Sequence, residues 1–433
     1  MSEILIRQAK HWKTGAEVDV RIREQKIVSV TAAGTEKPGS AEAFEARGAI
    51  VAPGLVDPHV HLREPGQGSK ETIATGTRAA AAGGFTAVLC MPNTNPVVDE
   101  AARVEWVLHR AAEAGNCRVH PIAAVTLGQK GEQLAEFQAL EKAGAAALSD
   151  DGRPVVSAAI MRRALEYARH TKLPIVCHEE DPDLKGDGVM NEGPTATRLG
   201  YRGIPWAAES VMVRRDCDLA AFTGGRVHLA HLSCAASLDA LRDAKRRGLH
   251  VTGETCPHYW MLTDEAVAKL GTHAKMNPPL RSEADRKAVI AAIADGTLDC
   301  LCTDHAPHTA EEKTQPFDSA PFGIVGLETA LALTVTGLVR PGSITMERAI
   351  ELWSEAPRRL FGLDEVRVEP GFAADLVVFD PAEEWTVDPN AFHTKGRSTP
   401  FAGATVHGRV KLTVCAGRVT HTDVSVAAGA PVR

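Results

Sequence analysis

The sequence has no apolar run long enough to cross a bilayer, and its first residues contain no hydrophobic stretch of the kind found in signal peptides. Its nine cysteines are scattered, without a single CxxC pair. Scattered cysteines in a chain without a signal are typical of reduced thiols in the cytosol. We therefore expect a cytoplasmic protein that has no membrane partner.

An excess of positive charge is also absent. The chain has 48 Lys and Arg residues against 55 Asp and Glu residues, which gives a net charge of −7. Because a general nucleic-acid binder normally carries a basic face, no nucleic-acid partner is expected. A small anionic substrate remains compatible, since a local site can be positive within an acidic protein. The proportions of 44% hydrophobic and 24% charged residues are those of an ordinary globular protein.

The two ends of the chain share a short alternating pattern of apolar residues. The segments ILIRQA and EVDVRIREQKIVSVT near the start, and FAADLVVFD and GATVHGRVKLTVCAGRVTH near the end, are typical of strands and hairpins. Neither end is long enough to form a full core alone. We therefore predict that residues 1–52 and 366–433 meet in one small β-sandwich domain.

Residues 53–365 alternate strand-like and helix-like runs, and we predict that they form the catalytic domain. The expected strands are Val51–Val56, Thr86–Met91, Val119–Val125, Ala145–Leu148, Leu173–Cys177, Val227–Ala230, His250–Gly253 and Leu298–Cys302. The expected helices are Ser69–Ala82, Asp99–Ala114, Glu132–Ala143, Ser157–Thr171, Ala207–Phe222, Ala235–Arg247, Glu283–Ala294 and Gly323–Val339. Eight strands each followed by a helix predict an α/β fold, a (β/α)₈ TIM barrel. The alternative, a doubly wound open sheet, needs a glycine-rich fingerprint after its first strand, and none is present.

A pair of histidines follows the first predicted barrel strand. His59 and His61 are two residues apart, so strand geometry directs both side chains to the same face. Two neighbouring imidazoles are readily accommodated by a divalent metal, because zinc binds neutral imidazole nitrogen. An HxH pair is a weak signal by itself, and the alternative is two partly exposed loop histidines.

Similar residues recur where other predicted strands end. They are Asp150 and Asp151, His178, His231, and Asp304. In a barrel all of these positions lie on the face where catalytic residues gather. Four histidines and two carboxylates are too many ligands for one tetrahedral zinc, and they suit two metals bridged by a carboxylate and a hydroxide. The pattern alone does not decide which of the two adjacent aspartates forms the bridge.

Several motifs resemble one known family. DPHVHLREP and TDHAPHTAEEK resemble the two signatures of cyclic amidohydrolases, and SDDG, MPNTNP, MNPPLR and PFGIVGLET extend the resemblance to nearly the whole chain. The sequence is thus similar to dihydroorotases of the bacterial class with an aspartate metal bridge. This resemblance implies two Zn²⁺ ions per subunit, bridged by Asp151 and a hydroxide. One zinc ion would be held by His59, His61 and Asp304, and the other by His178 and His231.

The resemblance also implies a reaction, the reversible cyclisation of N-carbamoyl-L-aspartate to dihydroorotate in pyrimidine synthesis, with Asp304 as general acid and base. The substrate carboxylate needs a cationic fork, and Arg63 can bond it bidentately; the alternative for Arg63 is a surface ion pair with Glu64. The residues that would bind substrate by resemblance are His61, Arg63, Asn93, Asn277, His308, Phe322 and Gly323. A homodimer is usual among such enzymes, and an aspartate transcarbamoylase partner is compatible with the sequence.

Two other functions fit the sequence less well. Dihydropyrimidinases, hydantoinases and allantoinases bridge their metals with a carboxylated lysine at the end of strand four, where this sequence has Asp150 and Asp151, and Lys142 lies before that strand. A neutral hydantoin would also leave Arg63 without a partner. A non-catalytic scaffold associated with transcarbamoylase is disfavoured because all six expected metal ligands are present. Lys313, at the end of the second signature, has no role that the sequence reveals.

Overall fold

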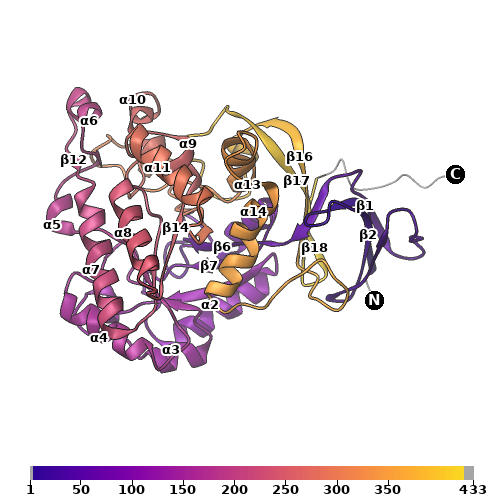
Figure 1. The fold of residues 1–433 in the computed structure, drawn as a ribbon, viewed down its shortest axis with the longest axis horizontal. Coiled ribbons are helices and arrows are strands. Elements are labelled where there is room, and N and C mark those ends of the chain that lie inside the picture. Colours follow the sequence, from indigo (N-terminus) through magenta and orange to yellow (C-terminus); the bar gives the residue numbers. More distant parts are fainter. Residues whose placement is uncertain (1–2, 424–433) are drawn as a thin grey trace.

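The computed structural model describes residues 3–423, and it has a barrel with a separate sheet at one side (Figure 1). That sheet takes strands from both ends of the chain, in the order β18-β17-β16-β5-β1-β2-β3, with β4 paired to β1. Its strands are β1 Glu3–His11, β2 Glu17–Arg23, β3 Lys26–Ala32, β4 Glu42–Glu45, β5 Ile50–Pro53, β16 Leu376–Thr386, β17 Thr405–Cys415 and β18 Arg418–Thr422. The two ends join where Val378 of β16 pairs with Val51 of β5 in antiparallel register. Residues 1–2 and 424–433 of the predicted terminal domain lie outside the described residues.

The barrel sheet contains eight parallel strands in chain order, which confirms the predicted fold class. They are β6 Leu55–Val60, β7 Phe85–Cys90, β8 Arg118–Ala123, β9 Ala147–Leu148, β10 Ile175–Cys177, β13 Val227–Leu229, β14 Val251–Thr255 and β15 Cys300–Leu301. The sheet is nearly closed beyond β15, where the backbone N–H of His61 donates to the carbonyl of His305 at 2.8 Å. This contact brings the first and last strand ends together.

Helices cover the outside of the barrel (Figure 1). The long ones match the predicted order: α1 Ile73–Ala82, α2 Ala101–Ala114, α3 Phe137–Ala143, α4 Ala158–Ala168, α7 Ala207–Thr223, α8 Ala235–Arg246 and α11 Glu283–Ala294. Thr72 and Ser282 begin α1 and α11 with capping boxes, in which the side chain satisfies backbone N–H groups that the first helical turn leaves free. No helix within residues 3–423 is long and apolar enough to cross a membrane.

Two predicted elements differ in the structure. The predicted strand Val51–Val56 is divided at Gly54 between the terminal sheet and the barrel; a Cβ atom at Gly54 would lie 2.2 Å from the side chain of Thr86, so only glycine fits this crossing. The predicted helix Gly323–Val339 begins only at α13 Ala330–Thr334 and continues as η4 Val335–Val339. Its first part is extended because Ile324 pairs with His305 beside β15. Gly323 therefore lies on the strand-end face.

Shorter elements occupy the connections. They are η1 Leu127–Gln129, α5 Pro182–Lys185, β11 Met190–Asn191, α6 Pro194–Leu199, β12 Gly203–Ile204, α9 Pro257–Met261, η2 Asp264–Ala266, α10 Val267–Leu270, η3 Gly271–Ala274, α12 Ala310–Lys313, α14 Met346–Ile350, η5 Glu351–Glu355, α15 Ala356–Leu360 and η6 Pro389–Ala391. Inside the barrel, a separate apolar cluster takes Val56 from β6, Leu89 from β7, Ile122 from β8 and Val176 from β10. Because its members come from successive strands, this cluster fills the bore and leaves the polar side chains at the strand ends.

Candidate active site

The six predicted metal ligands are all buried, and they converge at the carboxyl ends of the barrel strands. Their potential ligand atoms form two groups, within each of which all atoms lie within 4.8 Å of one another. One group is His59, His61 and Asp151, and the other is Asp151, His178 and His231. Asp151 belongs to both groups. Asp304 adjoins the first, with its Oδ1 atom 3.2 Å from Nε2 of His61 and 3.6 Å from Nε2 of His59.

The two carboxylate oxygens of Asp151 face different imidazoles. Oδ1 lies 3.4 Å from Nε2 of His59 and 3.5 Å from Nδ1 of His178, whereas Oδ2 lies 3.5 Å from Nε2 of His61. Nε2 of His59 is fully buried and takes part in no hydrogen bond within residues 3–423. A buried imidazole nitrogen without a partner is costly unless a ligand satisfies it. Together with the imidazole and carboxylate donor types, this unpaired nitrogen fits a pair of divalent cations that share Asp151.

Asp150 points elsewhere. Its Oδ1 atom accepts from the backbone N–H groups of Val125 at 2.8 Å and Thr126 at 3.1 Å, and the Thr126 hydroxyl donates to its other oxygen. Burial raises the pKa of Asp150 to about 6. For Asp151, burial alone would raise the pKa, but the charge of His59 and hydrogen bonds from the neighbouring histidines hold it well below the usual value. Asp150 therefore anchors the connection after β8, and Asp151 is the aspartate among the histidines.

Three residues of the site have a left-handed backbone although they are not glycine. Arg63 has φ 62°, His231 has φ 35° and Asp304 has φ 48°. This conformation is unfavourable for residues with a Cβ atom, and it persists where the surrounding structure imposes it, which is common at functional sites. The backbone is thus bent to direct these three side chains inward.

Sequence reasoning missed Glu254, which supports one of the histidines. Its Oε1 atom lies 3.1 Å from Nδ1 of His59, and its Oε2 atom lies 3.2 Å from Nε2 of His228. Burial would raise the pKa of Glu254, but its hydrogen bonds with His228 and His59 hold the value well below the usual range. An ionised Glu254 accepts a hydrogen bond from Nδ1–H of His59, so Nε2 is the ring nitrogen directed at Asp151 and available to a metal ion. The sequence offered one signal for Glu254, namely an acidic residue inside strand β14, which is largely buried.

A cavity of about 360 Å³ opens above the metal-ligand groups, a size that suits a small metabolite. Its lining includes every residue predicted to bind substrate. The full lining is His61, Arg63, Asn93, Asp151, Gly152, His178, Lys185, His231, Asn277, Asp304, Ala306, His308, Pro321, Phe322 and Gly323. The strand-end face therefore combines the metal-ligand groups with a pocket.

Arg63 is the buried cation of this pocket. Its Nε donates to the carbonyl of Pro307 at 3.2 Å, and it has no ion pair with a carboxylate within residues 3–423. Glu64, the alternative partner, instead accepts from the backbone N–H of Ile73 at 2.8 Å. Nη2 of Arg63 lies 3.3 Å from Nε2 of His308, and burial followed by the charge of Arg63 lowers the pKa of His308 to about 3. A guanidinium beside a neutral imidazole is well suited to bind an anion.

The two predicted asparagines differ in their partners. Oδ1 of Asn93 lies 2.9 Å from Nδ1 of His61, and its Nδ2 donates to Oδ2 of Asp151 at 3.0 Å, so its amide already orients two of the candidate ligands. Oδ1 of Asn277 is buried and has no hydrogen-bond partner in the described chain. Asn277 is therefore the better placed of the two to accept a hydrogen bond from a ligand.

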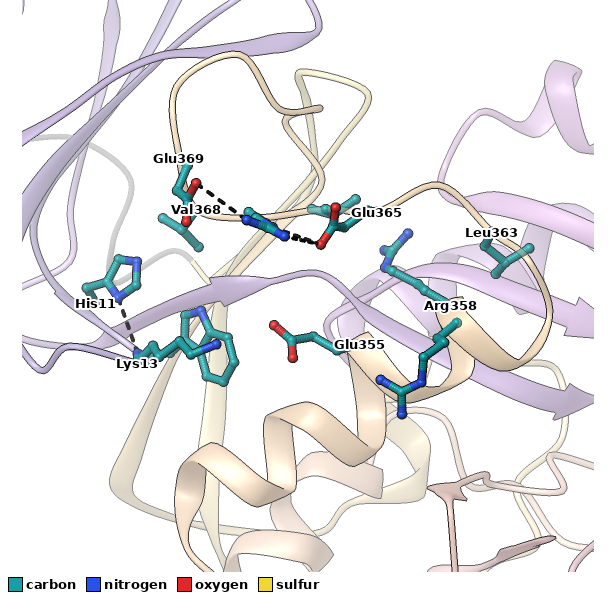
Figure 2. A pocket seen from close by; sticks show the side chains of 12 residues that line it. His11, Lys13, Glu355, Arg358, Leu363, Glu365, Val368 and Glu369 are labelled. Atoms are coloured by element: carbon teal, nitrogen blue, oxygen red, sulfur yellow. Dashed lines mark hydrogen bonds and ion pairs between the residues drawn. The ribbon is translucent and has the colours of Figure 1, made fainter. Parts of the chain in front are cut away.

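A second cavity, of about 440 Å³, lies between the end of β1 and α15 (Figure 2). Three of its charged side chains pair with one another: Arg367 lies 2.6 Å from Glu365 and 4.0 Å from Glu369. None of the histidines or aspartates at the strand ends lines it. We therefore place the chemistry in the smaller cavity at the barrel mouth.

Comparison with known proteins identifies related chains. A model of the dihydro-orotase-like family matches residues 48–237. The dihydroorotase of Anaeromyxobacter dehalogenans strain 2CP-1 is 55% identical over 406 residues, 93% of this chain and 93% of its own length. That of Desulforapulum autotrophicum is 53% identical over 390 residues, 89% and 91% of the two chains. Among solved structures, the L-hydantoinase of Arthrobacter aurescens has a TM-score of 0.86 at 23% identity, covering 98% of this chain and 96% of its own, which shows a shared fold.

Proposed function

Because the chain belongs to the dihydroorotase family, we propose that it is a cyclic amide hydrolase that interconverts N-carbamoyl-L-aspartate and (S)-dihydroorotate plus water. The observation that carries this proposal is the sharing of Asp151 by two buried histidine groups, beneath a pocket whose cation Arg63 has no carboxylate partner in the described chain. A carboxylate substrate supplies the missing partner. A neutral hydantoin does not.

The proposed metal is Zn²⁺, with two ions per subunit. His59, His61 and Asp304 would hold one ion, His178 and His231 the other, and Asp151 would be shared between them. When bound, such ions supply an activated water and polarise the carbonyl that is attacked. Glu254 and Asn93 contribute by fixing the orientation of His59 and His61 through the ring nitrogens that face away from Asp151.

Asp304 is the proposed general acid and base. Burial would raise its pKa, but a hydrogen bond with His61 and the charge of His59 lower it to about 2, so the carboxyl group is ionised at neutral pH. In ring opening, a water oxygen bonds to the ring amide carbon and the carbon–nitrogen bond breaks. Asp304 takes the proton of the attacking water and passes it to the departing nitrogen. In ring closure the same carboxylate moves a proton from the carbamoyl nitrogen to the departing oxygen.

The remaining pocket residues would bind and orient the substrate. Arg63 and the neutral His308 are proposed to hold the carboxylate that persists in the ring, and Asn277 to accept from a ring N–H group. His61, Asn93, Phe322 and Gly323 complete the proposed contacts at the pocket wall. These interactions would place the reacting carbonyl next to Asp304.

The first test is metal analysis of the purified protein in parallel with a dihydroorotate ring-opening assay. We expect two zinc ions per chain and loss of activity on chelation. One ion with full activity would exclude the shared role of Asp151. Turnover of hydantoin or allantoin in preference to dihydroorotate would favour those hydrolases, and indifference to both substrate and chelator would favour a scaffold.

We also propose that the protein is a homodimer and that the barrel spans residues 53–365, with 1–52 and 366–433 forming the terminal domain. Light scattering tests the first point, and repeating it with added aspartate transcarbamoylase tests association with that enzyme. Limited proteolysis tests the proposed domain bounds, since cleavage is expected first in exposed segments between domains.

A further inference from the structure

The segment 314–323 follows α12 and forms part of the pocket wall with its last three residues, Pro321, Phe322 and Gly323. It contains no regular secondary structure that satisfies its own carbonyl groups. Two buried lysines supply hydrogen bonds to this segment instead. Lys275 follows η3, two residues before Asn277, and Lys313 is the last residue of α12.

Lys275 holds the middle of the segment. Its ammonium group donates to the carbonyls of Phe317, Asp318 at 3.3 Å and Ala320 at 2.6 Å. The same ammonium lies 4.6 Å from the ring centroid of Phe322, within the range of a cation–π contact. All three N–H groups of this lysine are therefore used within the segment.

Lys313 holds the end that lines the pocket. Its ammonium donates to the carbonyls of Gly323 at 2.8 Å and Pro321 at 3.0 Å, and to that of Lys275 at 3.4 Å. The Lys275 carbonyl also accepts from the backbone N–H of Gly323 at 2.9 Å. The two lysines and the segment thus form one connected network.

Neither lysine has the partner that a buried cation usually has. Within residues 3–423, neither forms an ion pair with a carboxylate within 4.0 Å. Burial lowers the pKa of Lys275 to about 8, and burial together with the charge of Lys275 lowers that of Lys313 to about 7. Because lysine has only three donors, the carbonyl groups leave none free for a substrate.

We propose that Lys275 and Lys313 are positioning residues of the substrate pocket, which hold segment 314–323 so that Phe322 and Gly323 form its wall. This inference rests on the proposed function, in which Phe322 and Gly323 contact the substrate. His308 joins the same wall, since its Nε2 atom lies 2.9 Å from the carbonyl of Phe322. Displacement of the segment would therefore disturb both Phe322 and the imidazole next to Arg63.

Removing either ammonium group would destabilise the observed conformation of segment 314–323. Loss of Lys313 leaves the carbonyls of Pro321 and Gly323 without that donor, and loss of Lys275 does the same to Phe317, Asp318 and Ala320. Buried carbonyls without a donor are unfavourable, so the segment is expected to move outward to reach water. The metal ligands belong to other segments and are expected to stay in place.

The test compares Lys275→Met and Lys313→Met with Lys411→Met, which removes a buried lysine of the terminal sheet strand β17. For dihydroorotate we expect KM to rise about tenfold or more in the first two variants, with kcat within about threefold of the wild type. Hydrogen exchange of peptides spanning 314–323 is expected to become faster in these variants. Metal content per chain is expected to equal that of the wild type, and Lys411→Met should leave KM and exchange of 314–323 unchanged.

Three results would overturn the proposal. The first is unchanged exchange of 314–323, and the second is faster exchange with an unaltered KM. The third is loss of metal together with activity, because the lysines would then support the metal ligands rather than the pocket wall. If the methionine variants do not fold, Lys275→Gln and Lys313→Gln, which retain N–H donors, are expected to give smaller changes in the same direction. Absence of dihydroorotate turnover in the wild type would instead refute the proposed function, and the exchange measurement would still test whether Lys275 and Lys313 hold segment 314–323.

Discussion

Oε1 of Glu254 lies 3.1 Å from Nδ1 of His59, and this contact fixes which ring nitrogen of His59 faces Asp151. Glu254→Gln is expected to weaken metal binding by about 10- to 100-fold, because an amide supports the required tautomer less strongly than a carboxylate. Competition with a chelator measures this affinity. Thr252→Val, which removes the 2.8 Å hydrogen bond to Nδ1 of His228 one step further away, is the control and should have a smaller effect. If Glu254→Gln bound metal as tightly as the wild type, Glu254 would have no role in supporting the metal ligand His59.

The two adjacent aspartates can be separated by mutation. Asp151→Asn is expected to lose metal from both groups, since its carboxylate is common to them. Asp150→Asn is expected to keep the metal content and to lower the free energy of unfolding by about 1–3 kcal/mol, because it weakens buried hydrogen bonds to Val125 and Thr126. Elemental analysis and denaturant unfolding measure the two effects. If only the Asp150 variant lost metal, Asp150 rather than Asp151 would be the shared metal ligand.

Asp304→Asn tests the proton transfer. We expect retention of metal, because the other ligands remain, and a fall in kcat by about 10²–10⁴-fold, since an amide cannot accept the proton. Stopped assays of ring opening and ring closure should show the same loss. A near-normal rate in either direction would refute the role of Asp304 as general acid and base.

Arg63→Met tests the carboxylate site. The side chain is buried and has no carboxylate partner within the described chain, so its removal should mainly weaken substrate binding. We expect kcat/KM to fall about 10²-fold or more, chiefly through KM. Arg103→Met on the outer helix α2 is the matched control. An unaltered KM in Arg63→Met would move the carboxylate site elsewhere in the pocket.

Glu328 gives a prediction for pH dependence. Its carboxylate accepts from the backbone N–H of His393 at 2.8 Å, and burial raises its pKa to about 8. Between the ordinary carboxyl value and pH 8 the folded state therefore binds more protons than the unfolded state, so the free energy of unfolding falls as pH rises through this window. Glu328→Gln should reduce this decrease in the free energy of unfolding between pH 5 and 9 by an amount on the order of 2 kcal/mol. Urea unfolding at a series of pH values measures it, and parallel curves for the two proteins would contradict the prediction.

The sequence was sufficient to predict the barrel, because its strands are continuous apolar runs that end in polar residues. The positions of His59, His178 and Asp304 at those ends followed from the same pattern. Gly323 was misplaced in a helix, because the apolar run from Gly323 to Val339 has no internal signal that distinguishes its extended start. Its conformation depends on pairing between Ile324 and His305, a contact made only in the folded barrel.

The supporting residues were the least predictable part of the site. Glu254 is 195 residues away from His59, which it contacts, whereas Lys313 contacts carbonyls only 8 and 10 residues further along the chain. In neither case does the local sequence indicate which atoms the side chain will meet. Lys313 in particular bonds only backbone carbonyls, which every residue possesses. Local pattern therefore identifies side chains that face the pocket more readily than those that hold its walls.

The pairing of β5 with β16 also has a consequence for biosynthesis. Ile50 meets Phe379 in this register, so the edge of β5 has no partner until more than 300 further residues have left the ribosome. During that interval the nascent amino-terminal strands expose an unpaired edge, which makes them prone to aggregation or dependent on chaperones. The barrel, whose strands pair in chain order, can assemble while the chain is still growing. Completion of the amino-terminal region is thus delayed until the carboxyl-terminal strands are synthesised.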